Sequence, residues 1–368
     1  MNRRLVIVQP YVPEYRQPFF ELLIQSLKSE GTECVVAAGQ PRGKQSLRAD
    51  SSTAEWLVPV SSRELRIAGK SLNLGGSRPA WKSADAVILG HEGSSLDVYR
   101  ALLGSNRTGQ RIGLWGHIGS YVSRHHPVDA ALESWQLHRA DHIFAYTSSG
   151  ARFAIEAGAS RFKVTNVMNS VATEGLLATA RGLTAAEINA FRLEHALEKG
   201  KTYAFVGGLD SSKRIDFLSE ALNHLWNFDP TVRVIVGGEG DQSHLLNLAV
   251  DRGQAITIGR AGARDLAMIG RLAEAILMPG RIGLIAVEAL ALGIPVITTD
   301  WPYHAPEAEY LSEGVSMFTT PNDPESYARF VSKRLSRTIN SMGDCDWAYP
   351  SLAGMVDNFS RGVRSLLA

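Results

Sequence analysis

The 368-residue sequence lacks the features that mark several large classes of protein. Its two cysteines, Cys34 and Cys345, lie far apart and form neither a disulfide framework nor the paired spacing of a zinc site. Its formal net charge is only +1, whereas a protein whose main partner is nucleic acid normally carries a marked basic excess. The apolar run near the N-terminus is too short for a signal peptide or a membrane span, and we interpret it as a first strand. We therefore expect a cytoplasmic protein with no nucleic-acid partner.

Motifs for common cofactors are also missing. The sequence contains no GxGxxG fingerprint and no Walker A sequence, which argues against a nicotinamide oxidoreductase and against a P-loop enzyme. Its one Asp-x-Asp sequence, Asp344-Cys345-Asp346, comes late in the chain, away from the strand ends expected to hold a ligand. We interpret it as a surface turn, and we predict no metal site and no bound cofactor.

Short apolar runs alternate with helical patterns along the chain. The length exceeds that of a usual single core, and strands alternating with helices predict parallel sheets. The strand pattern pauses between Asn169 and Lys201 and then resumes. We predict an α/β fold with two doubly wound domains, residues 1–175 and 176–350, and an amphipathic helix over 351–368 that packs back on the first domain. The expected strands are 5–8, 33–38, 86–89, 112–115, 142–145, 164–167, 203–206, 232–236, 256–258, 275–278 and 296–299.

The stretch from Met278 to Asp300 combines a strand, a glycine loop, a helix and a second strand. The loop begins at Pro279-Gly280 and contains Gly283, and the apolar pattern from Leu284 to Leu292 predicts a helix that ends at Gly293. Glu288 interrupts this apolar helix one turn from its start. An unpaired carboxylate there is costly unless something donates hydrogen bonds to it, and a sugar hydroxyl could be that donor.

Residues 203–218 contain a strand, then Gly207-Gly208, then Lys213-Arg214 and the start of an apolar helix. Glycines let backbone N–H groups approach an anion, and a basic pair at a helix N-terminus can neutralise a diphosphate. The alternative interpretation is a solvated helix start. Two further strands end at Gly237-Gly238 and Gly259-Arg260, and ligands of open α/β sheets bind at the carboxyl ends of strands. Together these ends predict one crevice.

The first half of the chain offers weaker candidates. His117 follows the expected strand 112–115 and could contact a ligand across a cleft between the domains, although a structural histidine is the alternative. Tyr15 and Arg16 follow the first strand and could face the same cleft, with a plain surface turn as the alternative. Residues 41–82 contain eight basic and three acidic residues mixed with apolar ones. This segment is either a solvated loop or a patch for anionic lipid head groups at a membrane surface.

These motifs, in this order, resemble the retaining GT-B glycosyltransferases of the group 1, family 4-like type, and their bacterial envelope-polysaccharide branch. The resemblance covers nearly the whole second half and the end of the first. Its motifs are Gly207-Gly208-Leu209 with Lys213, Gly280-Arg281-Ile282-Gly283-Leu284 running to Glu288-Ala289, Pro295-Val296-Ile297, His304 to Leu311, Thr319 to Ala328 and Ala140 to Gly150. Two residues depart from the family pattern: Gly208 stands where the family has an arginine, and Gly280 where it has the first glutamate of a pair.

The resemblance implies a GT-B fold, with the two domains facing across a cleft, and metal-independent transfer of a sugar from a nucleotide diphosphate sugar to a glycan or lipid-linked acceptor, with retention, in polysaccharide biosynthesis. The low cysteine content favours a cytoplasmic location, and the basic segment 41–82 allows peripheral contact at the inner face of the membrane. The resemblance implies that His117, Lys213 and Glu288 are catalytic, and that the donor is bound by Gly207, Gly208, Lys213, Arg214, Gly280, Arg281, Ile282, Gly283, Leu284 and Glu288. The position of strand ends adds Gly238 and Arg260 to the donor-binding residues. Position alone makes Tyr15 and Arg16 the acceptor-binding candidates. The alternatives are a non-catalytic nucleotide-binding scaffold, an inverting GT-B transferase and a sugar-nucleotide epimerase.

Overall fold

The computed structural model of the protein describes residues 3–41, 46, 50–61, 63–67, 70–119, 127–333 and 347–368. The chain divides into two compact units. Unit 1 comprises Met1–Val171 and Pro350–Ala368, and unit 2 comprises Ala172–Tyr349. In the part of the chain that is described, no helix has both the length and the apolar character needed to cross a membrane.

Unit 1 is built on a seven-stranded sheet in which every pair of neighbours is parallel. Its central strands are buried on both faces, as expected for apolar strands covered by helices on either side. In the order β3-β2-β1-β6-β7-β8-β9, the strands are β3 (Leu57–Pro59), β2 (Thr32–Ala38), β1 (Arg3–Gln9), β6 (Ala86–Gly90), β7 (Arg111–Gly116), β8 (His142–Ala145) and β9 (Val164–Asn166).

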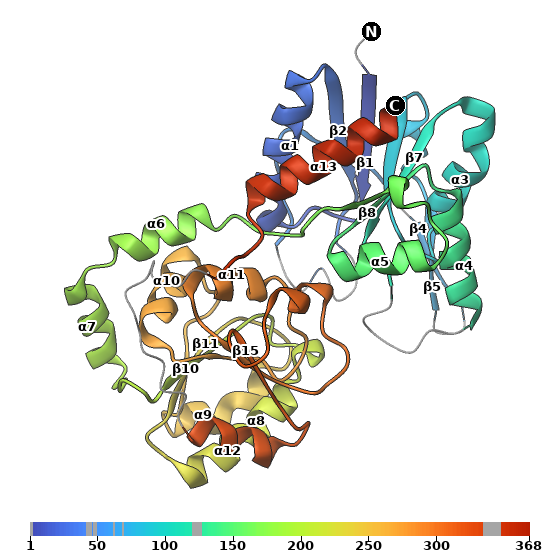
Figure 1. Ribbon diagram of the computed structural model, residues 1–368. Coiled ribbons are helices and arrows are strands. Elements are labelled where there is room, and N and C mark those ends of the chain that lie inside the picture. Colours follow the sequence, from blue (N-terminus) through green and yellow to red (C-terminus); the bar gives the residue numbers. More distant parts are fainter. Residues whose placement is uncertain are drawn as a thin grey trace. The chain divides into compact units, whose positions relative to one another are not determined.

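The helices of unit 1 include one from the far end of the sequence. They are η1 (Glu14–Arg16), α1 (Gln17–Ser29), α2 (Arg78–Trp81), α3 (Leu96–Thr108), α4 (Pro127–Arg139), α5 (Ser148–Glu156), η3 (Arg161–Lys163) and α13 (Leu352–Leu367). Helix α13, red in Figure 1, lies beside α1. Its apolar face is buried, and Phe359 stacks on Phe144 with ring centroids 4.5 Å apart. The hydroxyl of Ser351 caps α13 by accepting from the Gly354 amide at 3.0 Å. The predicted closing helix is therefore confirmed.

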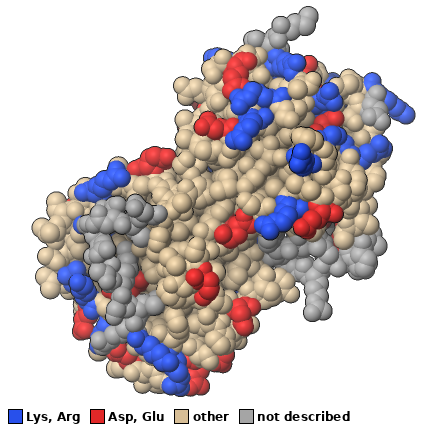
Figure 2. All heavy atoms as spheres, viewed as in Figure 1, with Lys and Arg blue, Asp and Glu red and all other residues tan. Residues whose placement is uncertain are grey.

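The basic segment 41–82 is more regular than the predicted loop. It contributes β3 to the sheet and forms an antiparallel hairpin of β4 (Arg63–Ile67) and β5 (Lys70–Gly75). Three of its basic residues, Arg42, Lys44 and Arg48, lie outside the described residues, so the lipid-binding patch stays a prediction. On the face seen in Figure 2, Lys and Arg side chains are interspersed with Asp and Glu.

Unit 2 repeats the parallel plan with six strands in the order β12-β11-β10-β13-β14-β15. The strands are β10 (Thr202–Val206), β11 (Arg233–Gly237), β12 (Ala255–Thr257), β13 (Ile276–Leu277), β14 (Val296–Thr299) and β15 (Met317–Thr320). The helices are α6 (Glu174–Gly182), α7 (Ala185–Glu194), η4 (Ser211–Lys213), α8 (Ile215–Phe228), η5 (Ser243–Leu246), α9 (Asn247–Asp251), α10 (Ala263–Leu272), α11 (Ile285–Leu292), η6 (Pro306–Tyr310) and α12 (Pro324–Ser332). The predicted fold class, two doubly wound Rossmann-like domains, is confirmed.

The strand order of unit 2 has one switch point that positions a site. From β10 the chain proceeds outward on one side to β11 and β12, and on the other side to β13, β14 and β15. A switch point of this kind is where open α/β sheets form a ligand crevice, so the crevice is expected at the carboxyl ends of β10 and β13. These are the two loops that carry the basic pair and the glycine loop of the sequence.

Candidate functional site

The candidate site is built from two segments at this switch point. We call residues 207–214, which follow β10, the basic turn, and residues 279–284, which follow β13, the glycine loop. β10 and β13 are hydrogen-bonded neighbours, with Ala204 opposite Ile276. Segments separated by more than sixty residues in the sequence are thus brought together by one strand pairing.

The basic turn is stiffened by its own side chains. The carboxylate of Asp210 caps η4 by accepting from the Ser212 amide at 2.8 Å and from the Ser212 hydroxyl at 2.5 Å. Arg214 then adopts a left-handed conformation, with φ of 56°, before α8 begins at Ile215. A non-glycine residue in that region is strained unless its surroundings hold it there. Contacts of the Arg214 side chain provide that support.

Arg214 is held by acceptors from three separate segments. Its Nη1 donates to the Pro279 carbonyl at 3.3 Å, to the Thr299 hydroxyl at 3.4 Å and to the Asn322 side-chain oxygen at 2.5 Å. The guanidinium also lies over the Phe217 ring, 4.3 Å from its centroid. Burial lowers the pKa of Arg214, and Asp216 partly offsets this shift. The guanidinium is therefore a fixed cation at the crevice.

The glycine loop is docked directly onto the basic turn. The Arg281 amide donates to the Ser212 carbonyl at 2.9 Å, and Nζ of Lys213 donates to the Arg281 carbonyl at 2.5 Å. A Cβ placed on Gly280 would lie 2.4 Å from the carbonyl carbon of Lys213. No side chain fits at that distance unless the backbone shifts, so only glycine allows this approach. The packing explains why the glutamate of the resembling family is absent at this position.

Glu288 lies on α11, immediately after the glycine loop. Its side chain keeps some exposure, yet burial among apolar neighbours raises its pKa from 4.5 to about 7, with Lys213 as an opposing influence that lowers it. Within the described residues, no hydrogen bond to the Glu288 carboxylate is formed. The amides of Gly283 and Leu284, at the start of α11, likewise donate to no acceptor in that part of the chain. Helix N-termini with such amides suit anions.

The ends of β11 and β12 lie beside the basic turn. The Gly238 amide donates to the Gly259 carbonyl at 2.7 Å, which joins the end of β11 to the end of β12. A Cβ on Gly238 would lie 1.9 Å from the Gly207 carbonyl oxygen, so glycine is required for this close approach too. Arg260 follows Gly259 and is exposed. The structure therefore brings Gly207, Gly208 and Gly238 together, with Arg260 at the margin.

Sequence reasoning missed polar residues that follow the last two strands. His304, beyond β14, bonds the glycine loop, and Asn322, beyond β15, bonds Arg214. Thr299 at the end of β14 donates its hydroxyl to the Pro279 carbonyl at 3.0 Å. Both His304 and Asn322 lie in stretches that contributed to the family resemblance. Applying the strand-end rule to the predicted strand 296–299 could have identified His304. Asn322 was beyond the rule, because β15 was not among the predicted strands.

The candidates of unit 1 have different surroundings. His117 follows β7, and its ring contacts that of Tyr146 with centroids 4.7 Å apart. Tyr15 is 46% exposed, but Arg16 is only 6% exposed and donates to the Asn169 side-chain oxygen at 2.6 Å. Its guanidinium also lies 5.8 Å from the Trp115 ring centroid. The burial of Arg16 indicates a structural role and argues against direct contact with an acceptor substrate.

One further carboxylate in unit 1 escaped the sequence reasoning. Glu92 lies two residues beyond β6, and burial raises its pKa. Its Oε1 lies 3.3 Å from where a Cβ on Gly90 would stand, so the carboxylate folds back over the strand end. His117 was chosen because it follows a predicted strand, and the same rule could have identified Glu92.

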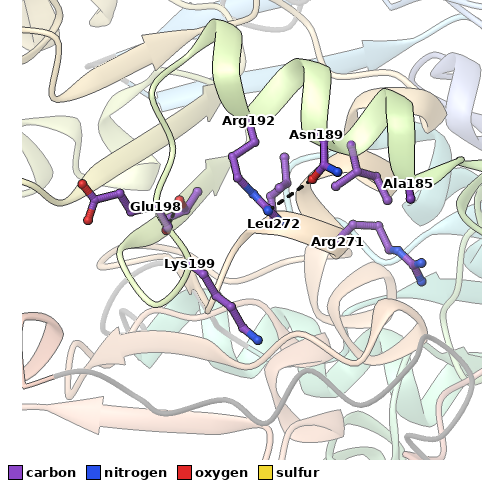
Figure 3. A pocket seen from close by; sticks show the side chains of 9 residues that line it. Ala185, Asn189, Arg192, Glu198, Lys199, Arg271 and Leu272 are labelled. Carbon is purple, nitrogen blue, oxygen red and sulfur yellow. Dashed lines mark hydrogen bonds between the residues drawn. The ribbon is translucent and has the colours of Figure 1, made fainter.

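A separate pocket of about 520 Å³ lies in unit 2 (Figure 3). It is formed by α7, the loop that follows it and the end of α10, near the amino-terminal ends of β10 and β13. Ligands of open parallel sheets bind at the opposite ends of the strands. This pocket is therefore not the candidate site. It is lined by Ala185, Ile188, Asn189, Arg192, Glu198, Lys199, Thr202, Arg271 and Leu272.

Among the described residues, no group of three or more His, Cys, Asp or Glu residues is arranged to hold a metal ion. Asp344, Cys345 and Asp346 lie outside the described residues, so their interpretation as a surface turn stays a prediction.

Comparison with known proteins identifies the second half of the chain. Residues 200–337 match the sequence model of the family described as Glycosyl transferases group 1. No curated protein matches the chain. The match spans the basic turn, the glycine loop and Glu288.

Solved structures resemble the whole chain. HepE from Anabaena, in complex with UDP and glucose, has 12% identity and a TM-score of 0.66, covering 99% of this chain and 100% of that one. A glycosyltransferase from Rickettsia africae has 13% identity and a TM-score of 0.67, covering 99% of both chains. The UDP-GlcNAc 2-epimerase from Methanocaldococcus jannaschii has 13% identity and a TM-score of 0.57, covering 98% of this chain and 99% of that one. Such identities establish the fold alone. With the group 1 domain, this chain is a glycosyltransferase with the GT-B fold.

Proposed function

We propose that this glycosyltransferase moves a sugar from a nucleoside diphosphate sugar to a glycan or lipid-linked acceptor, with retention of the anomeric configuration. One observation carries the proposal: a Lys-Arg turn, two loop amides and a carboxylate that accepts no hydrogen bond from the described residues meet at one switch point. The structural neighbour HepE supports it, since that protein was crystallised with UDP and glucose and also with UDP-glucose.

The diphosphate would lie between the basic turn and the start of α11. Lys213 and Arg214 supply two cations, and the amides of Gly283 and Leu284 supply donors at a helix N-terminus. As the nucleoside diphosphate leaves, negative charge grows on its oxygens. Donors that are already fixed stabilise that charge more in the transition state than in the ground state. In this proposal the protein's own cations stabilise the leaving group, without a metal.

Glu288 would receive the ribose hydroxyls of the donor. A carboxylate whose pKa is about 7 is costly to ionise where it stands, and hydrogen bonds donated to it favour the ionised form. Ribose hydroxyls would supply those bonds and would lower the pKa on binding. The nearby Lys213 places a compensating positive charge on the same side.

The acceptor side of the reaction is the less constrained part of the proposal. The resemblance assigns His117 to the transferred sugar, and position after the first strand makes Tyr15 the acceptor candidate. Retention by front-face attack lets the departing phosphate take the acceptor proton. Glycan assembly at the inner face of the membrane, with the basic segment 41–82 against anionic lipid, would fit a lipid-linked acceptor. This part rests on the resemblance.

A thermal-shift panel of UDP, GDP, ADP, dTDP and their sugar conjugates tests the proposal. A ligand that binds the native state raises its apparent stability, and one nucleoside diphosphate should do so well above the others. If none does, the proposal is refuted. The neighbouring 2-epimerase makes epimerisation the second candidate. Conversion of the donor sugar without any acceptor would favour that function over transfer.

A further inference from the structure

His304 lies between the glycine loop and the end of β14. The Ile282 amide donates to its Nδ1 at 3.3 Å, and its Nε2 lies 3.3 Å from the Thr299 carbonyl oxygen. The Ala305 amide donates to the Ile282 carbonyl at 2.9 Å. Both backbone groups of Ile282 are thus bonded to residues 304 and 305. The Trp301 ring packs edge-on against the imidazole, with centroids 5.8 Å apart.

These contacts select a single form of the imidazole. Nδ1 must be unprotonated to accept from the amide, whereas Nε2 must carry the hydrogen to donate to the carbonyl. Burial lowers the pKa of His304, and the cations Lys213 and Arg214 lower it further, against the opposing influence of the Thr299 and Gly280 carbonyls. These surroundings favour the neutral imidazole, and the two contacts place its hydrogen on Nε2.

The bond to Ile282 decides which loop amides face the crevice. Ile282 turns its side chain into the core, where it is fully buried, and its amide is occupied by His304. The next two amides, those of Gly283 and Leu284, bond no acceptor among the described residues and stand at the start of α11. Fixing Ile282 therefore fixes the direction in which those two amides point.

We propose that His304 is a positioning residue for the donor: its neutral imidazole holds the Ile282 amide and so presents the Gly283 and Leu284 amides to the diphosphate. The inference deepens the proposed function and rests on it. His304 touches neither substrate nor reacting atoms in this role. It acts through the glycine loop.

Three variants of His304 distinguish a role in positioning the glycine loop from a general role in stabilising the fold. His304→Ala removes both bonds, His304→Asn keeps an acceptor near the Nδ1 position, and His304→Gln keeps a donor near the Nε2 position. His195→Ala is the matched control, because His195 is a half-buried histidine of the same unit that packs on Phe191 at the end of α7, with centroids 4.4 Å apart. Each protein is titrated calorimetrically with the nucleoside diphosphate that stabilises the wild type most.

We expect His304→Ala to raise the Kd about tenfold, the loss expected for one to two hydrogen bonds, and His304→Asn to restore it to within about threefold of wild type. His304→Gln should bind as weakly as His304→Ala, and His195→Ala as tightly as wild type. Wild-type affinity in His304→Ala, or rescue by Gln and not by Asn, would overturn the inference while leaving the proposed function standing. If no nucleotide in the panel stabilises the wild type, both are overturned. Should His304→Ala fail to fold, the Asn and Gln pair still decides.

Discussion

Replacing Glu288 with glutamine should make the protein more stable and a weaker nucleotide binder at the same time. Burial raises the pKa of this carboxyl from 4.5 to about 7 in the folded chain. Each unit of pKa difference between folded and unfolded states corresponds to about 1.4 kcal/mol. The ionised wild-type side chain therefore costs the folded state up to about 3 kcal/mol, and a neutral amide of the same shape avoids that cost.

The sign of the pH dependence follows from which state binds the proton more tightly. Below pH 4.5 the carboxyl is protonated in both states and contributes nothing to the difference in stability. Between pH 4.5 and about 7 the unfolded chain ionises while the folded chain resists, so wild-type stability falls as the pH rises, and above pH 7 the full cost is present. Glu288→Gln should thus exceed wild type in melting temperature by up to roughly 6–12 °C at pH 8, with little difference near pH 5.

Thermal unfolding by circular dichroism at pH 5, 6, 7 and 8 measures this effect, and calorimetric titration measures the loss of nucleotide affinity. Losing hydrogen bonds to a charged acceptor should weaken binding by about tenfold or more. Glu220→Gln, at an exposed position on α8, is the control for removing one charge from unit 2. The reasoning fails if the gain in stability is the same at every pH, or if Glu288→Gln binds nucleotide as tightly as wild type.

Three further predictions concern Lys213, Gly280 and Phe359. Lys213→Ala should depress turnover about 10²- to 10³-fold in a nucleotide-release assay because a fixed phosphate donor is lost, and near-wild-type activity would exclude that role. Gly280→Ala should destabilise unit 2 in urea unfolding by about 1–3 kcal/mol through the clash with the Lys213 backbone, whereas Gly283→Ala, with no atom within 4 Å of its added Cβ, should not. Phe359→Ala should destabilise unit 1 by about 3–5 kcal/mol, because the ring is fully buried, yet leave nucleotide-induced stabilisation of unit 2 in place.

The alternation of apolar runs was enough to predict two parallel sheets and the closing helix, because strand and helix periodicity is a local property of the sequence. It did not predict the edge strands β3 and β15. The predicted helix 284–292 is α11 within one residue, and the predicted strand 296–299 is β14. The rule that ligands bind at strand ends selects residues 207–214 and 279–284 from the sequence alone. That rule needs only the chain direction, because the carboxyl ends of parallel strands lie at the same edge of the sheet. The order of the strands did not follow from the alternation.

Contacts made across long sequence separations could not be predicted in this way. Arg16 follows a strand, as His117 does, but η1 turns its side chain inward, where it meets Asn169 and Met355. Those partners lie 153 and 339 residues away in the sequence. Whether a polar residue after a strand faces solvent or core depends on what packs over it. In unit 1, α13 packs over Arg16, and the sequence around Arg16 does not indicate this contact.

The two departures from the family pattern, Gly280 and Gly208, differ in whether the structure has room for a side chain there. At Gly280 an added Cβ would lie 2.4 Å from the backbone of Lys213, so a glutamate would push the glycine loop off the basic turn and break the bonds that Arg281 makes there. At Gly208 an added Cβ would meet only one side-chain oxygen of Asp210, at 3.1 Å, and no backbone atom, so an arginine needs only a small shift of that side chain. The first glycine is therefore required by this packing, and the second is not. Because Gly280 draws the loop onto the turn, the change brings Lys213 to the loop carbonyl beside Glu288. The departure therefore alters which groups line the donor crevice, and it is not by itself a sign that the crevice has lost its use.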